Sequence, residues 1–412
     1  MTDIIQEYDV IIVGGGASGL YSAVTASNLN KKVLLLEKNE KTGKKLYITG
    51  KGRCNVTNDC NEREFLENVV TNSKFLTGAI YSCPSEKIVQ FFNDNNCKLK
   101  TERGNRVFPL SDKASDITKT LEKTCLKQKV DIKLNTEVKE IIIEEGVVKG
   151  VCTEYGNYYS RSVIICTGGV SYPLTGSTGD GYRFAKESGH TVIKPKPSLC
   201  GINLNNGFLK ELQGLSLKNV VFTVFFGEKV VFSELGEMIF THFGVSGPIV
   251  LSASAYINKL DGKNITLEID FKPALTEDVL EKRIIRELAA ANTKHISSAA
   301  ATLVPKTFVK TFLKTANVKS DKKCCEITTE ERLRMVKTLK FFRLNYNSLR
   351  PIEEAIITSG GVNVKEINPK TMESKLVKNL FFAGEVLDVD ALTGGFNLQT
   401  AFCTAYLAGI NA

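Results

Sequence analysis

Six residues, Gly14 to Gly19, constrain this chain more than any other stretch because of the segments that flank them. An apolar run, Tyr8 to Val13, precedes the glycines, and a helix-prone segment, Leu20 to Asn28, follows them. A second apolar run, Val33 to Leu36, then ends at Glu37. The order predicts strand, glycine turn, helix, strand and acid, which is the βαβ arrangement of a dinucleotide site.

Three of the glycines have distinct structural roles in that arrangement. Gly14 permits the tight turn, Gly16 lets the backbone approach a diphosphate, and Gly19 lets helix and strand pack closely. The helix N-terminus adds free N–H groups and the positive end of its dipole. Glu37 lies 18 residues beyond Gly19, close to the roughly 20 expected for the acid that holds the ribose hydroxyls. A glycine-rich turn in an unrelated α/β domain would not account for that acid. A carboxylate also repels a 2′-phosphate, so the pattern favours FAD or NAD over NADP.

The length and composition are those of a globular protein. The 412 residues suffice for two or three domains, with 42% hydrophobic and 24% charged residues. No apolar run approaches the roughly 20 residues of a membrane span, so no membrane partner is expected. Met1 to Ile4 lacks a basic start followed by an apolar core, which argues against a signal peptide. We therefore expect a cytoplasmic protein whose 11 cysteines stay reduced.

The net charge of +9 comes from 54 basic and 45 acidic residues. It suits an anionic ligand or substrate, or it reflects a lysine-rich proteome. The lysines are scattered and form no block of five or more like charges, so a nucleic-acid partner is not expected. The oligomeric state is left open.

The rest of the chain predicts an α/β fold in which a Rossmann-like FAD-binding domain is interrupted by an insertion. Residues Lys38 to Asn58 suggest a long loop, and Asn61 to Asn95 and Ser111 to Gln128 suggest helices, the latter capped by Ser111 or Asp112. Three short antiparallel strands are expected within Val130 to Ile165.

The insertion is expected to combine β-rich and helical parts. Several β-type runs lie between Val192 and Asp270, and Leu275 to Leu339 is mostly helical. A buried strand over Leu380 to Glu385 and a closing helix over Asn397 to Gly409 return to the first domain. We expect three parts: an FAD-binding domain of residues 1–191 and 350–412, an inserted β-rich domain of residues 192–274 and 325–349, and a helical subdomain of residues 275–324.

A second glycine motif lies near the C-terminus, from Gly384 to Gln399. A buried strand delivers Glu385, and then Gly394 and Gly395 open a helix. Glycines at a helix N-terminus offer bare N–H groups to an electron-rich ligand edge, such as N1 and O2 of a flavin. An ordinary strand–loop–helix with a glycine hinge explains this motif equally well in isolation. Its pairing with Gly14 to Gly19 in one domain favours the flavin.

The loop Gly43 to Asn58 follows directly after the ribose acid, so the fold carries it along the cofactor. Glycines in it permit close approach to a flat ring, and Lys45, Thr49, Arg53 and Asn55 supply donors. A lysine-rich surface loop is the alternative. Cys54 and Cys60 have the spacing C-x5-C, which fits unrelated thiols better than a redox pair.

Only three histidines are present, so a zinc site is not supported and no metal is expected. His242 follows Phe240-Thr241 and precedes Phe243-Gly244. It is either a proton donor at the flavin or a core imidazole, and the core role is favoured.

These segments together resemble the YhiN/BaiN-like flavoproteins, an FAD-binding family that includes enzymes called aminoacetone oxidases. The resemblance runs nearly end to end. It is carried by the segments Gly14–Gly19, Lys45–Asn58, Gly104–Asp112, Thr167–Tyr182, Thr241–Pro248, Thr358–Val362, Thr371–Ser374 and Phe382–Gln399. Asn105, Leu110 and Phe396 depart from the common family residues, and Cys60 is outside the pattern.

The resemblance implies a discontinuous FAD domain of the glutathione-reductase type, an inserted β domain and a small helical domain. It also implies that FAD is contacted by Gly14, Gly16, Ser18, Gly19, Glu37, Lys45, Gly50, Val138, Thr167, Gly384, Asp388 and Asn397. The family's reactions include amine oxidation with oxygen and reduction of conjugated steroid C=C bonds, so membership defines the cofactor better than the substrate.

We therefore expect an FAD-dependent oxidoreductase that acts on a small or hydrophobic organic substrate, with NAD(P)H as a possible transient reductant. Arg53 and Asn55 are expected to orient the substrate, with His242 as a third catalytic candidate. The further cofactor-binding candidates are Ala17, Lys38, Thr49, Gly52, Gly168, Glu385, Gly395 and Leu398. Competing functions are an NADH-dependent ene-reductase, an amine oxidase, a tRNA-modifying flavoprotein and a non-catalytic flavin sensor.

Overall fold

The computed structural model describes residues 7–260 and 262–412, and it divides the chain into two compact units. The discontinuous unit comprises residues up to Ser198 together with Pro351–Ala412, and the inserted unit is Leu199–Arg350. The N-terminal segment Met1 to Ile4, in which no signal peptide is expected, lies outside the described residues.

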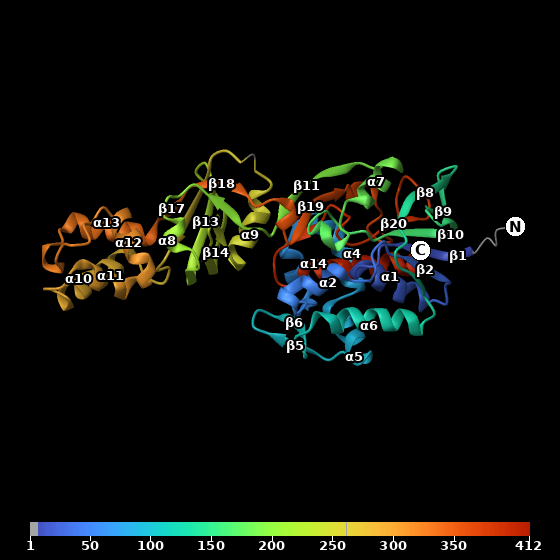
Figure 1. Ribbon diagram of the computed structural model, residues 1–412, viewed down its shortest axis with the longest axis horizontal. Coiled ribbons are helices and arrows are strands. Elements are labelled where there is room, and N and C mark those ends of the chain that lie inside the picture. The colour runs from blue at the N-terminus through green and yellow to red at the C-terminus, as the bar shows by residue number, and fades with distance from the viewer. Residues whose placement is uncertain (1–6, 261) are drawn as a thin grey trace. The chain divides into compact units, whose positions relative to one another are not determined.

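The discontinuous unit is built on a seven-stranded sheet with the order β7-β2-β1-β10-β9-β8, in which β20 also pairs with β10 (Figure 1). Strands β1, β2, β7, β10 and β20 are parallel, and β8, β9 and β10 form an antiparallel meander. The strands are β1 (Glu7–Val13), β2 (Val33–Leu36), β7 (Asp131–Lys133), β8 (Val138–Glu144), β9 (Val147–Thr153), β10 (Gly156–Ile165) and β20 (Leu380–Phe382). Near-continuous burial of β1, β2 and β20 is what a parallel sheet covered on both faces requires.

Helices cover this sheet, and the first and last of them pack against each other. Their apolar residues join the sheet in one hydrophobic core. The helices are α1 (Ala17–Ser27), α2 (Lys44–Ile48), α3 (Glu62–Glu67), α4 (Ser73–Ser82), α5 (Ser85–Asp94), α6 (Ala114–Lys127), α7 (Asp180–Glu187) and α14 (Phe396–Asn411). Smaller sheets pair β3 (Thr57–Asn58), β6 (Arg106–Pro109) and β5 (Leu99–Glu102), β21 (Asp390–Ala391) with β4 (Val69–Thr71), and β11 (Val192–Ser198) with β19 (Ile357–Val362).

Three local predictions differ from the structure in detail. The stretch Asn61 to Asn95, expected to be helical, forms three helices, because β4 follows α3 and Asn72 with φ +57° and Pro84 begin new segments. The helix α6 starts at Ala114, since Asp112 has φ +57° and neither Ser111 nor Asp112 caps it. The expected loop Lys38 to Asn58 contains the short helix α2 and a 3₁₀ turn.

The inserted unit contains a seven-stranded antiparallel sheet with the order β17-β16-β13-β14-β15-β12-β18. Its strands are β12 (Ile202–Leu204), β13 (Ser216–Phe226), β14 (Lys229–Phe240), β15 (Gly244–Ser246), β16 (Ile265–Asp270), β17 (Phe342–Leu344) and β18 (Tyr346–Leu349). Its helices are α8 (Leu209–Leu212), α9 (Pro248–Ile257), α10 (Glu277–Ala290), α11 (Ile296–Leu303), α12 (Val309–Thr315) and α13 (Thr329–Lys340).

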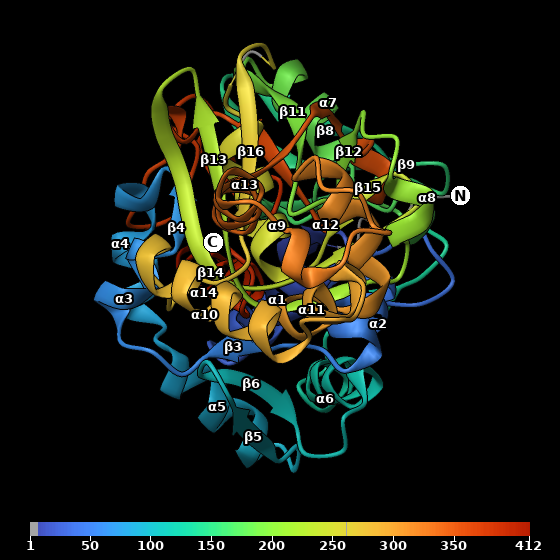
Figure 2. The same cartoon turned by 90° about the vertical axis from the view of Figure 1, so that its left-hand side faces the viewer.

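Helices α10 to α13 form one group within the inserted unit, drawn in yellow-orange to orange in Figures 1 and 2. Their buried side chains share a hydrophobic core with the sheet, in which Phe271, Phe308 and Phe342 lie in mutual contact. The expected α/β class, with an interrupted Rossmann-like domain, is confirmed. The finer three-part boundaries stay a prediction. Within the described residues, no helix has the length and apolarity needed to cross a bilayer.

Candidate cofactor and active site

The first glycine turn joins β1 to α1. Gly14 has φ +102°, and a Cβ on it would lie 2.7 Å from the carbonyl oxygen of Cys166, so only glycine fits. A Cβ on Gly16 would meet no atom within 4 Å. Gly16 is also the N-cap of α1, whose first turn has neither a side-chain cap nor an acid. Free N–H groups therefore face an open space, which fits an anionic ligand.

Glu37 is buried at the end of β2 and is held against this turn. Its Oε2 accepts a hydrogen bond of 2.7 Å from the N–H of Gly15, and its Oε1 accepts one of 2.8 Å from the N–H of Asn39. The neighbouring Lys38 Nζ lies 2.6 Å from the carboxylate of Asp180. Glu37 therefore lies at the turn, where the spacing from Gly19 predicts it for a βαβ dinucleotide site.

Segments far apart in sequence converge on this turn. A Cβ on Gly384 would lie 2.6 Å from Ser18 Oγ, so the C-terminal motif touches the start of α1. Asn58 Nδ2 donates a hydrogen bond of 3.0 Å to the carbonyl of Gly394. The N–H of Gly43 bonds the carbonyl of Gly15 at 2.8 Å. The two glycine motifs and the loop after Glu37 therefore form one continuous region of the discontinuous unit.

An ion pair and hydrogen bonds around Glu385 stabilise the region in which the two glycine motifs meet. Lys45 Nζ lies 2.9 and 2.7 Å from the two carboxylate oxygens of Glu385 and donates a 2.6 Å hydrogen bond to Ser171 Oγ. The N–H of Thr358 donates to Glu385 Oε1 at 2.9 Å, and Thr358 Oγ1 accepts from the N–H of Val170 at 2.9 Å. Lys45 and Glu385 are both predicted cofactor residues. The supporting Ser171 and Thr358 were missed as individual residues, although both lie in segments that carry the resemblance.

The second glycine turn opens α14. Gly395 has φ +103° and is the N-cap of the helix, again without a side-chain cap or an acid in the first turn. Asn397 folds the preceding loop back, because its Oδ1 accepts from the N–H of Ala391 at 2.9 Å and its Nδ2 donates to the carbonyl of Ala391 at 2.7 Å. Asn397 thus shapes the turn, and the bare N–H groups of α14 are left for a ligand.

The loop between α2 and β3 is held in an unusual conformation. Gly50, Lys51, Gly52 and Cys54 all have left-handed φ, and such strain in non-glycine residues is common at functional sites. Two buried oxygens near these turns, Asn55 Oδ1 and Thr167 Oγ1, have no hydrogen-bond partner in the described part of the chain. Unsatisfied buried polar atoms call for a ligand or water. These atoms, the open space at Gly16 and the uncapped N-termini of α1 and α14 fit an FAD molecule.

Arg53 makes different contacts from those expected of a free substrate-binding cation. Its guanidinium lies 2.5 Å from both Glu102 and Asp112, and 4.2 Å from the ring centre of Phe108. The Arg53 hydrogen bond is the main cause that lowers the pKa of Glu102, and those of Lys100 and Arg53 lower the pKa of Asp112. The charge of Arg53 is therefore matched by carboxylates in this structure.

Cys54 and Cys60 are both free thiols. Burial raises the pKa of Cys54 to about 12, and burial followed by the nearby Glu64 raises that of Cys60 to about 11. High thiol pKa values disfavour the reactive thiolate, in keeping with the expectation of unrelated thiols.

The remaining candidates are distributed as follows. His242 is exposed in the inserted unit, and its ring centre lies 5.1 Å from that of Phe243, so it is not a core imidazole.

The other predicted cofactor residues lie in the discontinuous unit. Asp388 accepts a hydrogen bond of 3.0 Å from Asn72 Nδ2, and Val138 is buried at the start of β8. Thr49 Oγ1 donates to the carbonyl of Leu46 at 2.7 Å. Ala17 and Gly19 lie in the first turn of α1, Gly168 follows Thr167, and Leu398 lies in the first turn of α14. No cluster of three or more potential metal ligands occurs in the ranges 7–260 and 262–412.

Comparison with known proteins identifies the family to which the chain belongs. The family described as "HI0933-like protein Rossmann domain" matches residues 8–411. A 3-dehydro-bile acid delta(4,6)-reductase of Clostridium scindens is 28% identical over 403 residues, covering 97% of each chain. A ribosomal RNA dihydrouridine synthase of Haemophilus influenzae is 29% identical over 412 residues, covering 98% of each chain.

Solved structures share the fold at low sequence identity. The 3-ketosteroid-delta4-(5alpha)-dehydrogenase of Rhodococcus jostii covers 100% of this chain and 98% of its own, with a TM-score of 0.53 and 14% identity. A flavocytochrome c3 fumarate reductase covers 98% of this chain and 78% of its own, with a TM-score of 0.52 and 18% identity. The chain belongs to the HI0933-like Rossmann family, and it is an FAD-dependent oxidoreductase.

Proposed function

We propose that this protein uses FAD to reduce a carbon–carbon double bond conjugated to a carbonyl, with NAD(P)H as the reductant. The observation that supports the cofactor part is the contact between Gly384 and Ser18, which brings the C-terminal motif to the uncapped start of α1. The direction of the reaction is supported by two full-length relatives whose names both describe saturation of a double bond.

Residues of the first turn would hold the adenosine end of the cofactor. The N–H groups after Gly16 would bind the diphosphate, and Glu37 would bind the ribose hydroxyls. The α14 N-terminus behind Gly395 would face the flavin edge that gains negative charge on reduction. FAD supplies the hydride chemistry when it is bound. The protein contributes binding, orientation and exclusion of water.

The polar groups near the second turn would orient the substrate. Asn55 Oδ1 is buried without a partner in the described residues, so a substrate or flavin N–H would satisfy it. We keep Arg53 as a substrate-orienting candidate, which requires that it exchange one of its carboxylate partners for the substrate. The role of His242 as a proton donor stays a prediction from the sequence.

The decisive experiment is anaerobic stopped-flow spectroscopy of the purified holoprotein. NADH or NADPH should bleach the flavin absorbance, and an unsaturated 3-ketosteroid or a uridine-containing RNA should restore it. Rapid reoxidation by oxygen alone, with aminoacetone as the reductant, would instead support an amine oxidase. No bleaching by either nicotinamide and no reoxidation by either acceptor would overturn the proposal.

A matched pair of variants ties the reaction to the site. Asn55→Ala should lower the rate of substrate-dependent reoxidation and leave reduction by NAD(P)H largely unchanged. Asn61→Ala, which removes the side-chain cap of α3 on the surface, should change neither rate. Eleven cysteines without a disulfide bond in the described part of the chain fit a reducing compartment, so we place this activity in the cytoplasm.

A further inference from the structure

Positive charge is divided unequally between the two units. The inserted unit, Leu199–Arg350, contains 22 basic and 15 acidic residues, a net charge of +7. The remainder of the chain contains the other 32 basic and 30 acidic residues, a net charge of +2. Most of the chain's +9 therefore belongs to the smaller unit. A charge surplus confined to one unit indicates an anionic partner for that unit.

Within the inserted unit the surplus is concentrated in residues 288–325, which contain seven lysines and a single acid, Asp321. Six of these lysines are exposed. Lys310 and Lys314 lie four residues apart on one face of α12, and Lys306 lies in the 3₁₀ turn just before the helix, so these three exposed lysines form a row along this segment. The other face, with Phe308 and Phe312, is buried in the core.

A second group of cations lies where two loops run side by side. The N–H of Cys324 bonds the carbonyl of Lys294 at 2.9 Å, and the N–H of Ile296 bonds the carbonyl of Lys322 at 2.8 Å. These bonds bring the exposed Lys294 and Lys323 to one edge of the helical group.

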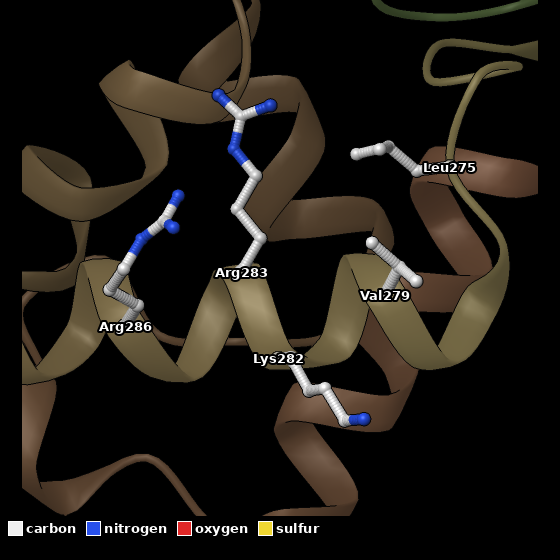
Figure 3. Close-up of a pocket in the computed structure, with 5 residues that line it drawn as sticks. All are labelled: Leu275, Val279, Lys282, Arg283 and Arg286. Atoms are coloured by element: carbon white, nitrogen blue, oxygen red, sulfur yellow. The ribbon is translucent and has the colours of Figure 1, made fainter.

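A pocket of about 380 Å³ adjoins these elements (Figure 3). It is lined by Leu275, Val279, Lys282, Arg283 and Arg286. Arg283 and Arg286 extend from the same side of α10 in Figure 3. Arg283 Nη2 donates to the carbonyl of Thr302 in α11 at 3.4 Å, while its Nε is buried without an acceptor in the described part of the chain. The pocket thus combines guanidinium groups, an unused buried donor and apolar side chains.

We propose that α10, α11 and α12, with the loops between them, form a docking surface for single-stranded RNA. The lysine row would contact successive phosphates, and the arginine pocket would receive an unpaired nucleotide, because guanidinium groups both bind phosphate and stack on bases. RNA as the carrier of the reacting base rests on the proposed function, whereas binding of RNA does not.

Two other anionic partners fit this surface less well. An amphipathic helix that lies on a membrane presents its apolar face to lipid, but the apolar face of α12 is buried in the protein. A protein interface needs an apolar centre with aromatic anchors, and the exposed residues of α12 and its start are lysines and threonines. Binding that depends on many spaced cations and few apolar groups is typical of a phosphate backbone.

The test is fluorescence anisotropy of the holoprotein with a labelled single-stranded RNA of mixed sequence, over a series of salt concentrations. The variant carries Lys306→Ala, Lys310→Ala and Lys314→Ala. A matched control carries Lys119→Ala, Lys123→Ala and Lys127→Ala, which form an exposed row with the same spacing on α6 of the other unit. The variant should bind about tenfold more weakly, and its log–log salt slope should fall by about 2.

The control triple should bind like the wild-type protein. Equal salt slopes for wild type and the α12 variant, or equal losses in both triples, would overturn the proposed surface. Equal binding of the wild type to polyglutamate or to phosphatidylglycerol vesicles would also overturn the choice of RNA. Flavin bleaching by NAD(P)H without RNA is measured on the same proteins, so a failure of the proposed reaction is seen separately from a failure of docking.

Discussion

Lys45 and Glu385 are 340 positions apart in the chain, yet the Lys45 ammonium lies within 2.9 Å of both carboxylate oxygens of Glu385. Each side chain is 21% exposed, so the pair is largely shielded from water. Ser171 and Thr358 complete the coordination of Glu385 with a hydroxyl and a backbone N–H. This pair closes the discontinuous unit by joining its first segment to its last.

Removing the Lys45 charge should therefore lower the free energy of unfolding more than removing the charge of the neighbouring Lys44. Lys45→Met leaves Glu385 partly buried without its cation, and we expect a loss of about 2 kcal/mol in the free energy of unfolding. Lys44→Met removes a pair whose carboxylate partner, Glu40, is 61% exposed to water, and it should cost less than about 1 kcal/mol. Urea unfolding of the two variants measures the difference.

The double variant Lys45→Met with Glu385→Gln provides the check on mechanism. If the pair acts as a unit, the double variant should be more stable than the sum of the single losses predicts. Strict additivity would mean that the two side chains act independently, contrary to the observed geometry.

Gly16→Val should separate cofactor binding from folding. A Cβ at Gly16 would touch no protein atom within 4 Å, so the substitution should fold normally while it blocks the space assigned to the diphosphate. We expect a colourless protein with an unfolding transition close to that of the cofactor-stripped wild type. Absorbance in the flavin bands and thermal unfolding measure the two effects.

Gly207→Val is the matched control for this substitution, since a Cβ there also meets no atom within 4 Å and the backbone φ is outside the left-handed range. It should retain wild-type flavin content. Full flavin content in Gly16→Val would remove the first glycine turn from the cofactor site.

Thiol reactivity should follow exposure and not the C-x5-C spacing. Cys325 is exposed, whereas burial raises the pKa of Cys54 to about 12. Because the thiolate is the reactive form, iodoacetamide at about pH 8 should modify Cys325 first and leave Cys54 intact. Peptide mass spectrometry over a time course measures both rates, and Cys325→Ser should abolish the fast reaction. Comparable labelling of Cys54 in the folded protein would show that its thiol is accessible after all.

The sequence predicts the βαβ unit well because every signal in it is local. The strands, the glycines and Glu37 follow one another within 30 residues, so the local sequence pattern is enough to determine the βαβ fold of this segment. The convergence of Gly384 on Ser18 could be expected only from the resemblance, since no local pattern encodes a contact between the two ends of the chain.

Other features depend on backbone conformation or on three-dimensional grouping. The left-handed Asn72 and Asp112 lie just before α4 and α6, and apolar periodicity alone does not mark where those helices start. The partners of Arg53 come from Glu102 and Asp112, which the loop sequence does not contain. Lysines that lie four residues apart do not form a block of consecutive like charges. A search for such blocks therefore overlooks the excess of basic residues in the inserted unit.

His190 should make the stability of the protein depend on pH. Its imidazole is buried beside Phe382 and bonded to Ser374 Oγ at 2.7 Å, and burial lowers the pKa of His190 below its usual value. The unfolded chain therefore binds this proton more readily than the folded chain does. The stabilising contribution is complete above the unfolded-state pKa of about 6.5 and is lost as the pH falls below it, by at most about 1.4 kcal/mol per pH unit.

His190→Gln should accordingly flatten the change in unfolding free energy between about pH 7 and about pH 5, whatever it does to stability at neutral pH. His295→Gln replaces an exposed imidazole of the inserted unit and serves as the control, which should keep the wild-type slope. Urea unfolding at several pH values gives the slopes. An unchanged slope in His190→Gln would mean that other groups carry the acid sensitivity, because the lowered pKa requires His190 to take up its proton on unfolding.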